Sequence, residues 1–239
     1  MVAPRHPLAM RRSGRVSSTH VADLPFDLPD QLAQRLRTAA DIEGKIVRAL
    51  DALGPLSGRD VALLDVPAGP LRESLLATGL LPRDVTLEEP LKLDLPDASV
   101  DAVVALWGGF EGVHEAEMDE ADRVLRPGGR LLVVHDYGRD AVSGLVDGHK
   151  PGYGEWSQRS GPFLRDGGFK IRVLHCFWTF SSLDDARAFL GEAFGPPGEA
   201  VGAALKRPRL AWNVAVYHRW RGGVAPEQVV EAPEPLATA

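Results

Sequence analysis

Between residues 60 and 220, short apolar runs alternate with segments whose apolar residues recur every three or four positions. A short continuous apolar run is typical of a buried strand, whereas the longer spacing is typical of an amphipathic helix. Strands that alternate with helices favour a parallel sheet with helices packed on both faces. The sequence therefore predicts an α/β, doubly wound fold around a mostly parallel sheet.

The predicted elements follow one another with short connections. Strand-like segments lie at 60–66, 85–90, 99–107, 130–137, 169–180 and 210–220. Helices are predicted at 71–79, 115–125 and 183–194, and another after Asp30 that carries Ile42, Ile46, Leu50 and Leu53. Ser182 with Asp185 resembles a capping box at the start of the helix at 183–194. Residues 1–20 and 221–239 lack periodicity and are predicted to be mobile tails, which leaves 21–220 as one domain.

Composition excludes several classes of protein. The net charge of −6 does not favour nucleic acid or an anionic membrane surface as a partner. The single cysteine, Cys176, rules out an internal disulfide and a cysteine-cluster metal site, and no metal site is expected. No apolar run reaches the roughly 20 residues that a membrane helix needs. The arginines near the N-terminus precede no apolar segment, so a cytoplasmic protein is expected.

Two segments resemble a known family. Residues 120–134, EADRVLRPGGRLLVV, resemble the part of class I S-adenosylmethionine-dependent methyltransferases that leads into their fifth strand. Residues 95–106, LPDASVDAVVAL, resemble the fourth-strand segment of the same family. The last two predicted strands are similar to the family's sixth strand and its antiparallel seventh. This resemblance, which covers about residues 40–220, implies a Rossmann-like fold and S-adenosyl-L-methionine as the cofactor.

The stretch DVPAGPL, residues 65–71, occupies the place of the family's glycine-rich first motif. The resemblance implies that Asp65 and Gly69 match its acidic residue and central glycine, where the methionine end of the cofactor is held. Pro67 replaces the first glycine and Leu71 the third. A leucine at the third position tilts the following helix away or narrows the pocket, because glycine allows close approach there.

An acidic residue at the end of the second strand is the family's ribose acceptor. Glu88 and Glu89 lie 23 and 24 positions after Asp65, close to the spacing of about 20 found in nucleotide-binding units. A carboxylate can accept hydrogen bonds from both ribose hydroxyls. We expect Glu89 to have this role, with Glu88 second and Asp94 third, or the pair of glutamates to be a solvated strand end.

The spacing after Glu89 predicts a reduced edge of the sheet. Only 12 positions separate Glu89 from Asp101, whereas a crossover between parallel strands needs a dozen or more residues. The helix and strand that the family places here are therefore expected to be missing, with a loop in their place. That strand is the outermost in the family, so its loss leaves the central strands paired and the adenine wall smaller.

Polar and aromatic residues follow the predicted central strands. Trp107 comes at the carboxyl end of one strand, where ligands bind in open α/β sheets, and it is either a pocket residue or a core aromatic. His135 and Asp136 come at the end of the next strand. His135 could remove a proton from the methyl acceptor, with Asp136 beside it. Alternatively, the two side chains only hold each other and the loop in place.

Four further residues are predicted to contact a substrate. His114 lies in the loop after the strand at 99–107, where the family often has polar substrate contacts, and Tyr137 follows Asp136. Tyr153 and Trp156 lie on a glycine-containing loop that is either a lid over the pocket or a packed surface loop.

These features lead to three functional hypotheses. The first is methyl transfer from S-adenosyl-L-methionine to a small molecule. The second is a catalytically silent binding domain of the same fold, which Leu71 and the reduced edge favour. An NAD-dependent oxidoreductase is third, and the absence of any Tyr-x-x-x-Lys motif weakens its short-chain form.

Overall fold

The computed structural model describes residues 23–88, 91–108, 110–145, 158–165 and 167–223. Its six-stranded sheet has the order β2-β1-β3-β4-β6-β5. The strands are β1 (Asp60–Leu64), β2 (Leu81–Val85), β3 (Val100–Ala105), β4 (Leu125–Asp136), β5 (Lys170–Thr179) and β6 (Arg209–Trp220). Strands β1 to β4 are parallel, and β6 is antiparallel to both β4 and β5. The predicted fold class, a mostly parallel sheet with an antiparallel last strand, is confirmed.

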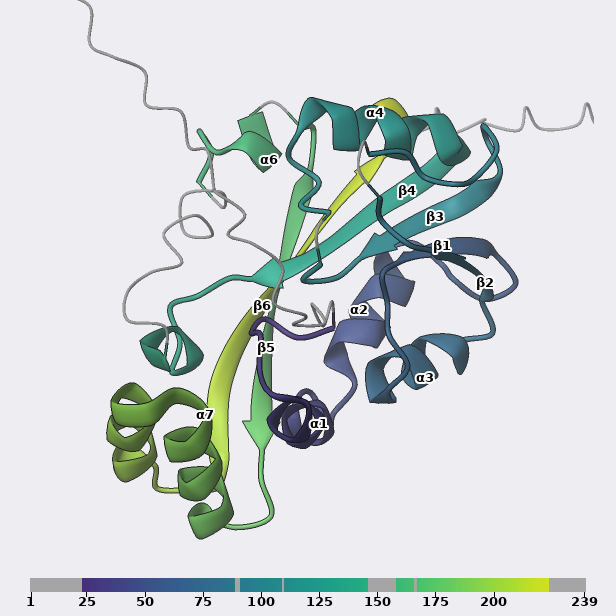
Figure 1. Cartoon of the computed structure of the whole chain (residues 1–239). Helices are drawn as coiled ribbons and strands as arrows, with labels where there is room; N and C mark the ends of the chain where they lie inside the picture. The colour runs from purple at the N-terminus through teal and green to yellow at the C-terminus, as the bar shows by residue number, and fades with distance from the viewer. Residues whose placement is uncertain (1–22, 89–90, 109, 146–157, 166, 224–239) are drawn as a thin grey trace, which may run out of the picture.

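Helices cover both faces of the sheet (Figure 1). One face carries α1 (Asp30–Ala39), α2 (Lys45–Leu53), α3 (Pro70–Leu76), α7 (Leu183–Ala204) and the 3-10 turn η1 (Val142–Leu145). The other carries α4 (Glu115–Val124) and the short α6 (Pro162–Arg165), and a second 3-10 turn, η2 (Arg221–Gly223), follows β6. Each face has its own apolar core.

The central strands are buried on both faces. In β1, Val61 and Leu63 belong to one core, whereas Ala62 and Leu64 belong to the other. This alternation follows from the pleat of a strand, which sends successive side chains to opposite faces. Because both faces are covered, the sequence of β1 is a continuous apolar run, as in other parallel sheets.

The predicted helix after Asp30 is two helices. The first ends at Ala39, and Ile42 lies in the connection with 62% of its surface exposed. The carboxylate of Asp41 accepts hydrogen bonds from the backbone N–H groups of Lys45 (3.1 Å) and Ile46 (2.7 Å) and so caps the second helix. The apolar period that suggested one helix holds within α2, but Ile42 is not part of it.

The second strand lies earlier in the chain than predicted. We expected it at 85–90, whereas β2 ends at Val85 and Glu88 lies beyond it. The sequence LPRDV contains a proline and two charges, and four of its five residues are exposed. These features suit an edge strand that pairs on one side only. Because the strand is not an apolar run, the prediction from apolar runs did not recognise it.

The reduced edge is confirmed within the described residues, since 86–88 and 91–99 contain neither helix nor strand. Two side chains of α4 bond this loop: Glu120 accepts the N–H of Leu93 at 2.9 Å, and the other contacts come from Arg123. Its guanidinium donates to the carbonyl oxygens of Leu93 (2.9 Å) and Leu95 (2.8 Å) and to the carboxylate of Asp97 (2.8 Å). The loop therefore depends on polar contacts with α4 and on the burial of Leu93 in the core rather than on pairing with the sheet.

The C-terminal half differs from the prediction mainly in length. The predicted cap of α7 is confirmed, since Ser182 Oγ accepts the N–H of Asp185 at 3.0 Å. The helix runs beyond residue 194, through a kink at Gly195, to Ala204. The predicted tails lie outside the described residues, except for 221–223, which form η2. Among the helices that the structure describes, none combines the length and apolar character needed to cross a bilayer.

Candidate functional site

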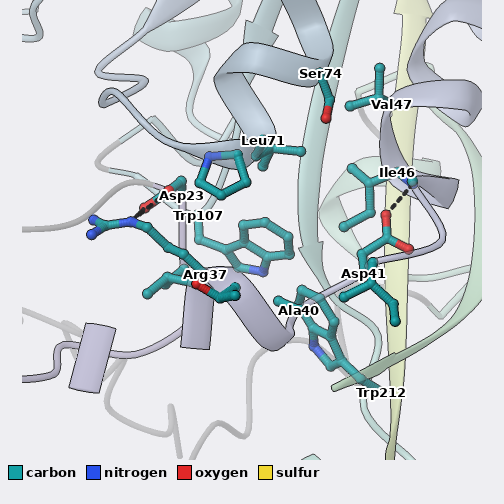
Figure 2. Close-up of a pocket in the computed structure, with 15 residues that line it drawn as sticks. Asp23, Arg37, Ala40, Asp41, Ile46, Val47, Leu71, Ser74, Trp107 and Trp212 are labelled. Carbon is teal, nitrogen blue, oxygen red and sulfur yellow. Dashed lines mark hydrogen bonds and ion pairs between the residues drawn. The ribbon is translucent and has the colours of Figure 1, made fainter. Parts of the chain in front are cut away.

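A pocket of about 320 Å³ opens where β1 and β3 end (Figure 2). It lies between α1, the turn that joins α1 to α2, and the first turn of α3. The side chains labelled around it are Asp23, Arg37, Ala40, Asp41, Ile46, Val47, Leu71, Ser74, Trp107 and Trp212. The volume is at the lower end of the range for small-molecule sites, about 300–1,000 Å³. The lining is mainly apolar, with a charged group at each end.

Two stacked tryptophans form one wall of the pocket. The rings of Trp107 and Trp212 lie 5.2 Å apart with 26° between their planes. Both indole N–H groups donate to the same oxygen of the buried Asp136, at 3.2 Å and 2.9 Å. Trp107 follows β3, whereas Trp212 comes from β6, so this carboxylate joins two distant parts of the chain. Asp136 thereby fixes the position of the tryptophan wall.

His135 does not accompany Asp136. The two residues are consecutive in β4, and their side chains point to opposite faces of the sheet. His135 is buried on the α4 side, where its Nε2 lies 3.1 Å from the carbonyl oxygen of Glu111 and its ring packs near Phe163 and Tyr217. It does not line the pocket. The expectation that the two side chains hold each other is therefore wrong.

The glycine loop has a conformation that only glycine adopts readily. Gly69 has φ 156° and ψ 179° and comes directly before α3. A side chain built on this residue would first meet Arg37 Cδ at 3.4 Å and Asp23 Oδ2 at 3.6 Å. The open side of Gly69 thus faces two charged groups from the N-terminal part of the domain.

These two groups form an ion pair at one end of the pocket. Arg37 Nε donates to both oxygens of Asp23, at 2.9 Å and 3.2 Å. The Asp23 side chain is 2% exposed and the Arg37 side chain 14% exposed. Sequence reasoning missed both residues, because neither belongs to a motif. The only signal was position, since Asp23 precedes the first helix and Arg37 lies within it.

The other residues of the loop have separate roles. Leu71 lines the pocket and packs against the core, where the third glycine of the motif would leave space. Asp65 has φ 50°, and its carboxylate accepts the N–H of Leu87 at 3.0 Å, which ties the end of β1 to the chain beyond β2. Neither Asp65 nor Pro67 lines the pocket.

The predicted ribose acceptors lie away from the pocket or outside the described residues. Glu88 is exposed beyond the end of β2, and Asp94 is exposed on the loop at 91–99. Glu89 lies outside the described residues. A further acidic residue, Asp84 of β2, was not considered from sequence, and Arg72 binds both of its oxygens at 2.6 Å and 2.8 Å. Neither Glu88 nor Asp94 lines the pocket.

The predicted substrate contacts are also dispersed. His114 precedes α4 with its side chain 68% exposed, and its Nε2 lies 3.3 Å from Glu111. Tyr137 is half-buried, with the guanidinium of Arg139 at 5.7 Å from its ring. Neither lines the pocket, and Tyr153 and Trp156 lie outside the described residues. Of the predicted site residues that the structure describes, Leu71 and Trp107 line the pocket, Gly69 lies beside it next to Asp23 and Arg37, and Asp136 lies behind the wall.

The end of the pocket opposite the ion pair is acidic. Asp41 lines it, and burial raises the pKa of this carboxyl group, although its hydrogen bonds to the α2 backbone and to Cys176 and the charge of Lys45 act in the other direction. Among the described residues there is no group of three or more His, Cys, Asp or Glu side chains suited to a metal ion.

Comparisons with known proteins give one match to a family model and several distant matches to solved structures. Residues 43–133 match a family model described as a methyltransferase domain, and no curated protein matches the chain. A SAM-dependent methyltransferase from Aquifex aeolicus is 18% identical, with a TM-score of 0.43 over 81% of this chain and 98% of its own. A protein from Bacillus halodurans C-125, described as a methyltransferase, is 12% identical, with a TM-score of 0.41 over 74% and 99%. Residues 43–133 of this α/β domain, with its mostly parallel sheet, are therefore similar to a methyltransferase domain.

Proposed function

We propose that the protein binds S-adenosyl-L-methionine in the pocket beside Gly69 and transfers its methyl group to a small, largely apolar acceptor. Open α/β sheets bind ligands at the carboxyl ends of their strands, where this pocket lies. The observation that carries the proposal is the juxtaposition of Gly69 with the Asp23–Arg37 pair. A residue confined to a glycine-only conformation faces a carboxylate and a guanidinium at the end of an apolar cavity.

This charged end suits the amino-acid part of the cofactor. An α-amino acid carries one carboxylate and one ammonium group, and Arg37 and Asp23 provide the complementary charges. In the described structure the two side chains bond each other, so both charges are satisfied without a ligand. We infer that Arg37 binds the carboxylate of the cofactor and Asp23 its ammonium group.

For the adenosine part of the cofactor, the described residues offer fewer binding partners than for its amino-acid part. No helix or strand among residues 86–88 and 91–99 provides an adenine wall, and Asp84 is already bonded by Arg72. We retain Glu89 as the proposed ribose acceptor, with Glu88 second and Asp94 third. The fit to the cofactor therefore rests mainly on its methionine end.

The bound cofactor supplies a methyl group on a positively charged sulfur. Direct displacement requires the acceptor to be aligned with that group and shielded from water. The tryptophan wall and Leu71 provide an apolar surface, and Asp136 holds the wall in place. The proposal gives His135 no part as a base, because its side chain is buried on the other face of the sheet.

A catalytically silent binding domain is the second candidate. Leu71 occupies part of the space that the third glycine of the motif leaves open, and the Asp23–Arg37 pair lies directly on Gly69. In this alternative the pair closes the cofactor site permanently, and the pocket binds another molecule or none.

Calorimetric titration of the full-length protein separates these candidates. We expect heat of binding with S-adenosyl-L-methionine and with its demethylated product, but none with NAD. Arg37→Gln should weaken binding at least tenfold. Arg35→Gln is the matched control, because Arg35 lies on the same helix but bonds Asp185 and Glu192 of α7. No binding of either sulfur compound to the wild-type protein would contradict the proposal and favour the silent domain.

Two substitutions in the glycine loop test its contact with the cofactor. Gly69→Val should abolish binding, because its Cβ enters the space between loop and ligand. Gly58→Val is the control for backbone strain, since Gly58 also has a positive φ (68°) but nothing lies within 4 Å of an added Cβ. Both variants should lose about 1–3 kcal/mol of stability. Leu71→Gly should leave cofactor binding intact or tighten it.

A further inference from the structure

A second site lies near the amino ends of the parallel strands, away from the pocket beside Gly69. Four basic side chains project there from one face of the sheet: Arg130 of β4, Lys170 and Arg172 of β5, and His218 of β6. In the strand register Lys170 is paired with His218, and Arg130 with the adjacent Trp220. Burial lowers the pKa of His218, and the charges of the other three residues lower it further. No carboxylate contributes to this shift.

Arg130 is the unusual member of this group. Its guanidinium stacks on Trp220 at 3.3 Å from the ring centre, and its Nε is buried without a hydrogen-bond partner among the described residues. Burial lowers its pKa. By contrast, Arg123, Arg126 and Arg219 each bond at least one carboxylate. A partly buried cation without a counter-charge is costly unless another molecule supplies the charge.

Two cavities adjoin this arginine. One, of about 360 Å³, is lined by Ala52 and Leu53 of α2, Arg130, Gly168, Lys170, His218, Arg219, Trp220 and Gly223. The other, of about 350 Å³, also contains Arg130 and Trp220 but includes Asp101. That carboxylate already bonds Arg126 at 2.8 Å. Arg219 directs its guanidinium to Asp122 and to the carbonyl oxygen of Gly167. Among the described residues, no acidic residue lines the first cavity, so its charged side chains available to a ligand are basic.

We infer that this cavity binds a phosphate group, either as inorganic phosphate or as part of a small phosphorylated metabolite, through Arg130, Lys170 and His218. A guanidinium matches two phosphate oxygens at once, and an ammonium group adds a point charge. A neutral imidazole can donate one further hydrogen bond. The site uses none of the residues assigned to the cofactor, so it stands independently of methyl transfer.

A purely structural role is the alternative. Helix α2 ends at Leu53, beside the cavity, and Gly54 lies close to the aliphatic part of Arg130. The carbonyl groups at a helix C-terminus stabilise a nearby cation. In that case Arg130 would support folding, and phosphate would bind no better here than elsewhere on the surface.

Calorimetry of the full-length protein at about 150 mM salt, close to physiological ionic strength, tests the site with two probes, inorganic phosphate and glycerol 3-phosphate. We expect saturable binding of at least one probe, and at least tenfold weaker binding in Arg130→Gln and in Lys170→Gln. The control is Arg83→Gln, which removes the same charge from a residue of β2 that is paired with Asp60 of β1. Tighter binding of glycerol 3-phosphate assigns the site to a phosphorylated metabolite, and equal affinities assign it to free phosphate.

Nuclear magnetic resonance of the histidine side chains provides a second readout that does not depend on the stability of Arg130→Gln. Bound phosphate should shift the His218 resonances and raise the pKa of His218, because an anion offsets the three neighbouring cations. Lys170→Gln, at an exposed position, should remove that response without unfolding the protein. The inference would be overturned by the absence of saturable binding, by an equal loss in Arg83→Gln, or by unchanged His218 resonances.

Discussion

The two edges of the sheet differ in the contacts that stabilise them. On the side of β5 and β6, aromatic rings interlock: Trp178 packs against Phe26, Phe189, Phe194 and Trp212. On the side of β2, the loop at 91–99 is held by hydrogen bonds to Arg123 and Glu120 of α4 and by the buried side chain of Leu93. The fold tolerates a missing outer strand because β1 remains paired on both sides, with β2 and β3. The difference teaches that an edge can shrink when a loop with one buried leucine and polar contacts to a neighbouring helix takes the place of a strand.

The exposed edge carries features that oppose pairing with another chain. Strand β2 has five residues, which include Pro82 and the charged residues Arg83 and Asp84. Proline lacks a backbone N–H, and charged side chains disfavour further strand addition. Loss of the outer strand in this chain is therefore accompanied by a short, charged edge.

The largest expected effect is a loss of folding stability at the edge formed by β5 and β6, where the aromatic rings pack. Trp212→Ala should destabilise the protein by about 3–5 kcal/mol, because it removes a fully buried ring and an indole N–H that donates to Asp136. On the reduced side, Leu91→Ala should cost about 1 kcal/mol, since Leu91 is only partly buried. Urea denaturation followed by circular dichroism measures both. Equal losses would mean that the two sides contribute alike to stability.

The next effect concerns cofactor binding at the reduced side. Glu89→Ala should weaken binding of S-adenosyl-L-methionine by about 1.5–3 kcal/mol, the range for hydrogen bonds to a charged group. Glu88→Ala should have a much smaller effect. Calorimetric titration distinguishes them, and small, equal effects from both would transfer the proposed ribose contact to Asp94.

A smaller effect is expected from the arginine that holds the loop. Arg123→Gln should lower global stability by about 1–2 kcal/mol, because it removes charge-assisted hydrogen bonds from a side chain that is 25% exposed. Amide hydrogen exchange at 91–97 should increase strongly. Arg126→Gln is the control, since Arg126 bonds Asp60 and Asp101 rather than the loop. Unchanged protection at 91–97 in Arg123→Gln would show that the buried Leu93 and the Glu120 contact hold the loop without Arg123.

The smallest expected effect is a pH dependence near the basic cavity. The pKa of His218 is lowered in the folded protein, first by burial and then by Arg130, Lys170 and Arg172. The unfolded chain therefore binds the proton more tightly, and stability should fall as the pH drops below the ordinary histidine value of about 6.5. His218→Gln should flatten this slope in urea denaturation at several pH values. An unchanged slope would assign the pH dependence to other groups.

Much of the fold was predictable from local patterns. The alternation of strand-like and helical segments identified β1, β3, β4, β5 and β6, and β1 and β3 were the clearest because strands buried on both faces are apolar along their length. The 12 positions between Glu89 and Asp101 predicted the reduced edge from chain length alone. The opposite directions of His135 and Asp136 were also predictable, since consecutive strand residues face opposite sides of a sheet.

The sequence by itself determined the order of the elements, the Ser182 cap and the position of Gly69 between a strand and a helix, because each depends on neighbouring residues. Only the tertiary structure decided that Asp23 and Arg37 lie on Gly69, that Trp107 and Trp212 share Asp136, and that basic side chains from three strands meet near His218. These contacts join segments far apart in the chain, and their partners are selected by how helices and strands pack. No local pattern of charge or hydrophobicity encodes such pairings.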